Sequence, residues 1–183
     1  MVVPKYAAEI ADALAQKLGP IQPAKADDPN ARLSGFANPK MAEFIDGAIE
    51  AGLKDPGAED VTAKYRNGPR KAELDGGVYL RPTIVRCDSF QHPLSNREYL
   101  CPYASVVQVP QADMLGQIGP SLVVTAITKE PKFIEQLLDS PLIENWLTGS
   151  GVNLVNHGNG RDERGDEGEV DKPRTVELFE WIQ

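Results

Sequence analysis

Two cysteines are the side chains of this sequence that are best suited to nucleophilic chemistry. A catalytic thiol needs a lowered pKa, which a cation, a helix N-terminus or a histidine can supply. His92 follows Cys87 by five residues, and Arg97 precedes Cys101 by four, so each thiol has a candidate partner nearby in sequence. A free cysteine more commonly serves as a small buried apolar residue. We therefore predict structural thiols at both positions and no catalytic residue.

The two histidines, His92 and His157, are the next candidates for chemistry. A metal site would need further ligands that converge on them. The run from Asp162 to Glu169 is the one rich source of carboxylates, and its spacing does not match a calcium-binding EF-hand loop. We predict solvated loop histidines, a solvated acidic segment and no metal.

The charge balance narrows the classes of partner. The chain has 183 residues and a formal net charge of −8, and its longest basic cluster is Arg70-Lys71. A nucleic-acid partner normally requires a basic face, so we expect none. No apolar run approaches the roughly 20 residues that a bilayer requires, and Met1–Lys5 does not read as a secretory signal. With two cysteines and no disulfide framework, we expect a cytoplasmic protein and no membrane association.

Hydrophobic periodicity predicts two helices in the first third of the chain. The first runs from Lys5 to Leu18, with one apolar face formed by Tyr6, Ile10, Leu14 and Leu18. The second begins at an Asn38 N-cap with Pro39 at the first helical position and ends at Gly52. Its expected apolar stripe comprises Met41, Phe44, Ile45, Ala48, Ile49 and Leu53.

The rest of the chain alternates between strand and helix patterns. Predicted strands are residues 61–64, 78–80, 83–85, 104–109, 121–127 (the strongest candidate for a buried strand) and 151–155, and predicted helices are 113–118 and 132–138. This alternation favours an α/β fold with a mainly parallel sheet flanked by helices over residues 1–155. Residues 156–172 are glycine-rich and acidic and predict a flexible loop, whereas residues 173–183 predict a C-terminal strand.

Six short motifs occur in a fixed order within residues 1–155. They are a strand and helix from Met1, the helix at Asn38–Gly52, Gly76-Gly77-Val78-Tyr79-Leu80-Arg81-Pro82-Thr83-Ile84, the segment Asn96–Pro102 with its following strand, the strand Ser121–Lys129, and the turn and strand Gly149–Asn153. The glycine-glycine to proline-threonine motif is the most specific of them. As an ordered set they resemble the C-terminal, catalytic-domain (thiol-domain) portion of the aldehyde dehydrogenase superfamily.

The resemblance assigns a cofactor role to two residues. The family's Glu-x-Phe pair contacts the nicotinamide ribose through the carboxylate and the nicotinamide ring through the aromatic side chain. Position by position, these roles fall on Glu98 and Leu100. The sequence departs from the family pattern at Arg97, Leu100 and Cys101, which replace an acidic residue, an aromatic residue and a glycine.

The family's dinucleotide-binding half, general base and nucleophilic cysteine would all precede this sequence. The resemblance therefore implies a truncated or fragmentary relative of an NAD(P)-dependent aldehyde dehydrogenase, which is inactive alone and does not bind NAD or NADP tightly by itself. The alternative is a non-catalytic α/β interaction module that dimerises or docks on a partner chain. In either case the C-terminal strand, with Phe179 and Trp181, would form a homo-oligomer contact or pack within the chain.

Overall fold

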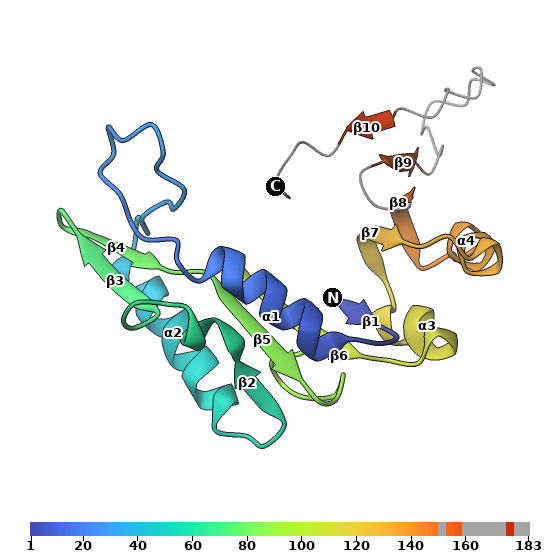
Figure 1. The fold of residues 1–183 in the computed structure, drawn as a ribbon, viewed down its shortest axis with the longest axis horizontal. Helices are drawn as coiled ribbons and strands as arrows, with labels where there is room; N and C mark the ends of the chain where they lie inside the picture. Colours follow the sequence, from blue (N-terminus) through green and yellow to red (C-terminus); the bar gives the residue numbers. More distant parts are fainter. Residues whose placement is uncertain (150–152, 159–174, 178–183) are drawn as a thin grey trace. The chain divides into compact units, whose positions relative to one another are not determined.

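A computed structural model describes residues 1–149, 153–158 and 175–177, and the chain divides into two units (Figure 1). Unit 1 comprises Met1–Met114 and unit 2 comprises Leu115–Gln183.

The central sheet of unit 1 has four strands in the order β1-β6-β5-β2. Their bounds are Val2–Val3 for β1, Tyr103–Gln108 for β6, Thr83–Cys87 for β5 and Ala58–Asp60 for β2. The strands β1, β6 and β5 are parallel, and only β2 runs antiparallel to its neighbour. The predicted α/β class with a mainly parallel sheet is therefore confirmed.

Helix α1 (Ala7–Leu18) packs on one face of this sheet through alanines. The buried row of the helix is Ala7, Ala11 and Ala15, spaced four residues apart, and it packs with Ile84 and Val106. The predicted face was wrong in this respect. Tyr6 precedes the helix and is 66% exposed, while the larger apolar residues Ile10, Leu14 and Leu18 lie only partly buried beside the row. Methyl side chains let the helix axis approach the strands more closely than leucines would.

Helix α2 (Pro39–Leu53) begins as the sequence predicts and packs with the opposite face of the sheet. The Asn38 side chain accepts a hydrogen bond from the Lys40 backbone N–H at 3.1 Å. The cluster around α2 includes Leu80 and Tyr103, and Tyr103 points away from the α1 side because Val106 is an odd number of residues further along β6. Helices on both faces are the usual environment of a parallel sheet.

The predicted apolar stripe of α2 is correct only in part. Ile45 and Ile49 are buried, but Phe44 is 70% exposed and Met41 is 41% exposed. The buried row is completed by the small residues Ala42 and Gly52. A Cβ atom on Gly52 would lie 2.6 Å from Cγ of Leu94, so the glycine permits a close approach between the helix and the segment after β5.

Two further elements of unit 1 differ from the prediction. Residues Val61–Lys64 form a short 3₁₀ helix rather than a strand, because the Thr62 hydroxyl bonds back to the Asp60 carboxylate at the end of β2. A hairpin of β3 (Lys71–Leu74) and β4 (Gly77–Leu80) turns at Asp75 and Gly76, both with positive φ. Only β4 was predicted, because β3 lacks an apolar run.

Helix α3 (Met114–Ile118) confirms the short predicted helix, and unit 2 then forms a second sheet in the order β10-β9-β8-β7. Its strands are β7 (Ser121–Ile127), β8 (Ile143–Gly149), β9 (Asn153–Gly158) and β10 (Thr175–Glu177). The pair β7–β8 is parallel, and the pairs β8–β9 and β9–β10 are antiparallel. Helix α4 (Pro131–Leu138), near the predicted bounds, contacts β8 and buries Phe133 and Leu137.

Several predictions for unit 2 are corrected or lie outside the described residues. Strand β7 has the predicted bounds but is not buried, since Val123 is 53% and Ile127 is 72% exposed on the outermost strand of the sheet. Strand β8 was not predicted, because its polar residues interrupt the apolar pattern. Strand β9 extends to Gly158, into the predicted loop. The remaining residues of that loop, 159–172, lie outside the described ranges. Residues 178–183 of the predicted C-terminal strand also lie outside them.

The alanine row of α1 leads to a prediction about packing. Replacing Ala11, which is fully buried, with leucine forces three extra carbon atoms between helix and sheet. We expect A11L to lower the free energy of unfolding by about 1–3 kcal/mol. The matched control is A13L on the exposed side of the same helix, for which we expect a change within about 0.5 kcal/mol. Urea unfolding followed by circular dichroism measures both, and equal effects would show that α1 does not pack through its alanines.

Candidate functional site

Glu98 and Leu100 lie in the segment that connects β5 to β6. Both side chains are exposed, and Leu100 is 79% exposed. Within the described ranges, the Glu98 carboxylate has no hydrogen bond or ion pair. A carboxylate and an aliphatic side chain two residues apart are thus open to solvent, and the cofactor role that the sequence resemblance assigns to them stays a prediction.

Hydroxyl groups of β6 hold the beginning of this segment against the sheet. The Tyr103 hydroxyl donates to the carbonyl oxygen of Leu94 at 2.5 Å, and the Ser105 hydroxyl donates to the carbonyl oxygen of Ser95. The Ser95 hydroxyl in turn donates to the His92 carbonyl oxygen at 2.8 Å. The Leu94 side chain is 1% exposed and completes the anchor. These contacts therefore hold residues 92–95 against the sheet, and the exposed Glu98 follows directly in the same segment.

Two of the sequence motifs meet at the start of strands β5 and β6. The Thr83 backbone N–H donates to the Pro102 carbonyl oxygen at 2.8 Å, and Thr83 lies opposite Tyr103 in the parallel register. The glycine-glycine to proline-threonine motif and the segment that carries Glu98 are consequently side by side at one end of the sheet. Sequence order alone does not require this proximity.

The two thiols have the properties of structural cysteines. Cys87 is 2% exposed, and burial together with the negative charge of Asp88 raises the pKa of its thiol to about 11. Burial also raises the pKa of the Cys101 thiol to about 11, although Arg70 opposes the shift. The prediction of a solvated His92 was wrong, because the ring is half-buried and lies beside Cys87, with 3.9 Å between Sγ and Nδ1. Neither thiol is held as a thiolate, so neither arrangement suits nucleophilic attack near neutral pH.

Sequence reasoning missed a buried ionic cluster centred on Arg70, whose side chain is 2% exposed. Its Nη1 lies 2.8 Å from an Asp46 carboxylate oxygen and 3.0 Å from one of Glu50, both on α2. Its Nη2 lies 3.1 Å from Asp60, and its Nε donates to the Thr83 hydroxyl at 3.1 Å. The one sequence signal is the spacing of Asp46 and Glu50, which places them on the same helix face.

Asp60 belongs to two buried ion pairs. Its carboxylate lies 2.7 Å from Nη2 of Arg66 and 3.1 Å from Nη2 of Arg70. Burial acts to raise the pKa of Asp60, but hydrogen bonds from Arg66 and Thr62 and the two positive charges outweigh it and hold the pKa below its usual value. The cluster joins α2, the end of β2, the 3₁₀ helix and β5, and it serves packing rather than ligand binding.

Disrupting this cluster should destabilise the chain far more than disrupting an exposed ion pair. R70M leaves Asp60 and Asp46 with one fewer cation, and we expect a loss of about 3–5 kcal/mol in the free energy of unfolding. The control is K64M, which removes the exposed pair of Lys64 with Glu59, 2.9 Å apart, and should cost less than about 1 kcal/mol.

The same cluster sets the sign of the pH dependence. A carboxyl whose pKa is lowered on folding contributes stability above its unfolded pKa, and this contribution is lost as the pH falls through the folded pKa. Urea unfolding of wild type at pH 7 and about pH 3 should therefore show a loss that is smaller in D60N, whose residue 60 does not titrate. An equal loss in the two proteins would contradict the role of Asp60.

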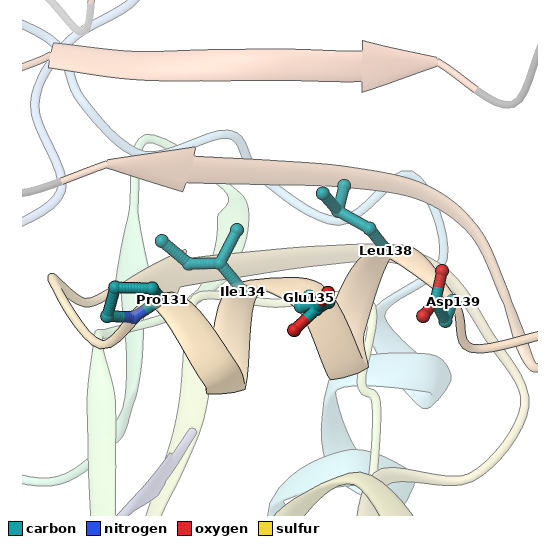
Figure 2. Close-up of a pocket in the computed structure, with 5 residues that line it drawn as sticks. All are labelled: Pro131, Ile134, Glu135, Leu138 and Asp139. Atoms are coloured by element: carbon teal, nitrogen blue, oxygen red, sulfur yellow. The ribbon is translucent and has the colours of Figure 1, made fainter.

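An open groove on unit 2 offers no comparable chemistry. Figure 2 shows Ile134 and Leu138 of α4 on one side of the helix, with Pro131, Glu135 and Asp139 completing the described lining. Among the residues that the structure describes, no three histidine, cysteine or acidic side chains are grouped closely enough to hold a metal ion. No helix in the described ranges is long and apolar enough to cross a membrane.

The solved structures that are similar to this chain include one of a dehydrogenase. The chain is similar to succinic semialdehyde dehydrogenase from Streptococcus pyogenes, solved in complex with NADP+, with a TM-score of 0.49 and 16% sequence identity. The similarity covers 72% of this chain and 30% of the dehydrogenase, so the chain spans less than a third of that protein. No family model and no curated protein matches the sequence.

Proposed function

We propose that the chain is a fragmentary relative of an NAD(P)-dependent aldehyde dehydrogenase that supplies the substrate-side wall of the site and no nucleophile. The observation that supports this is the meeting of two family-like motifs at β5 and β6, where the Thr83 N–H bonds to the Pro102 carbonyl oxygen. This arrangement presents Glu98 and Leu100 together beside the sheet. A fold shared with this family would by itself say nothing of activity, so the proposal depends on these side chains.

The chemistry of Glu98 and Leu100 fits the nicotinamide-ribose end of NAD or NADP. The carboxylate can accept hydrogen bonds from two adjacent hydroxyl groups, and the leucine can cover one face of the nicotinamide ring. The cofactor would supply the hydride acceptor in the complete enzyme. This chain would contribute only the orientation of the ribose, because burial raises the pKa of both thiols to about 11 and both therefore keep their protons near neutral pH.

We expect weak cofactor contact and no turnover. NAD and NADP titrated to about 10 mM, enough to reveal millimolar affinity, should shift the NMR amide signals of residues 96–100. E98Q should reduce these shifts, whereas E73Q, which changes an exposed carboxylate on β3, should not. Aldehyde oxidation, measured as cofactor reduction by absorbance, should be undetectable. Shifts absent from 96–100 would contradict the cofactor role, and turnover would contradict the claim that the chain alone is inactive.

A second candidate function is a non-catalytic module that assembles through its C-terminal strand. In the described part of unit 2, β10 is the outer strand of the sheet and pairs with β9 over Thr175–Glu177. An outer strand leaves one row of backbone donors and acceptors for another chain. We propose that a second copy of the chain pairs there, in addition to the pairing within the chain.

Light scattering on truncated chains tests this assembly. Deleting residues 175–183 should convert a dimer to a monomer. Deleting only 178–183 keeps β10 and should preserve the dimer if the strand itself forms the contact. Circular dichroism confirms that each truncated chain retains its fold. An unchanged mass after the longer deletion would contradict assembly through β10.

A further inference from the structure

The imidazole of His92 closes a tight turn at the beginning of the segment that carries Glu98. Its Nδ1 accepts the backbone N–H of Leu94 at 3.1 Å, and Sγ of Cys87 lies 3.9 Å from the same atom. The thiol keeps its proton, because burial raises the pKa of Cys87 to about 11. The Leu94 N–H therefore donates to a ring nitrogen that also lies beside the protonated thiol. A ring that accepts at Nδ1 carries its proton on Nε2 and is neutral.

The second ring nitrogen makes no hydrogen bond that would stabilise a protonated ring in the closed turn. Nε2 of His92 is buried and has no hydrogen-bond partner in the described ranges. A protonated ring would carry N–H groups at both nitrogens, so the bond from Leu94 would be lost. The Nε2–H would still lack an acceptor, and the Nδ1–H would face only the Cys87 sulfur, a weak acceptor 3.9 Å away, so the charge would be less well stabilised than on a hydrated ring.

We propose that His92 makes the conformation of residues 89–102 sensitive to acid. The neutral ring holds the turn closed through its hydrogen bond from Leu94, and protonation of the ring opens the turn. Release frees the Leu94 N–H and weakens the base of the segment that carries Glu98 and Leu100, while the Tyr103 hydroxyl still binds the Leu94 carbonyl oxygen. Because only a ring without a proton on Nδ1 can accept the Leu94 N–H, the closed turn is lost as the pH falls and the ring takes up a proton.

Other charged or titratable groups surround the turn, so the test needs a control that distinguishes their effects from that of His92. They are the Cys87 thiol on β5, the Asp88 carboxylate paired with Arg86, the Arg97 guanidinium that donates to the Pro93 carbonyl oxygen, the Tyr103 hydroxyl, and the Met1 ammonium that donates to the Ser105 carbonyl oxygen. Burial lowers the pKa of the Met1 ammonium, so this group loses its proton at a lower pH than an exposed N-terminus. A variant that removes only the His92 titration separates these effects.

Amide hydrogen exchange at Leu94 measures whether its N–H is still bonded to His92 and the turn is closed. We expect its protection factor, corrected for the intrinsic pH dependence of exchange, to fall at least about fivefold between about pH 7.5 and 5. Its midpoint should coincide with the titration of the His92 ring nitrogens followed by NMR. The Phe36 N–H, bonded to the Val78 carbonyl oxygen at 2.8 Å, serves as a reference that should remain protected.

H92N is the matched variant. An asparagine oxygen can accept the N–H two residues ahead in the same turn and does not titrate. In H92N we expect Leu94 protection that does not fall toward pH 5. Loss of protection in H92N equal to that in wild type would overturn the proposal. So would wild-type protection that stays constant while the His92 ring titrates, a result that needs no variant. Because no cofactor enters this experiment, its outcome is independent of the proposed function.

Discussion

The guanidinium of Arg70 is the interaction on which the arrangement of unit 1 depends. It is almost completely removed from solvent, and its donors reach α2, the end of β2 and the start of β5 simultaneously. A buried cation is tolerated only where its donors are satisfied, so these three segments are constrained to meet at one point. Asp60 extends the constraint to Arg66 and thereby fixes the 3₁₀ helix between β2 and β3.

Close packing on both faces of the sheet complements this ionic cluster. On one face α1 approaches through Ala7, Ala11 and Ala15, and on the other α2 approaches the segment after β5 at Gly52. Small residues at both contacts allow the elements to approach closely, and the larger residues fill the margins. The result is a closely packed β5–β6 pair, and the segment that connects the two strands exposes Glu98 and Leu100.

The connecting segment combines a fixed base with an exposed tip. Hydroxyl groups of Tyr103 and Ser105 and the ring of His92 hold residues 92–95, whereas Glu98 and Leu100 remain open to solvent. A segment that is held at its base and exposed further along keeps its side chains in place while leaving them accessible to a ligand.

Local sequence patterns were sufficient to predict the Asn38 cap of α2, the strands β5, β6 and β7, and the α/β class. The sequence also identified Glu98 and Leu100 through motif resemblance, a role that remains a prediction, and expected structural thiols, whose raised pKa values depend on burial. Tertiary structure alone decided that alanines rather than leucines face the sheet, that β7 is exposed, and that Arg70 meets three acidic residues distant in the chain. Periodicity reports which side chains are apolar along one element. Burial and ion pairing depend on how closely two elements approach, which only the assembled fold determines.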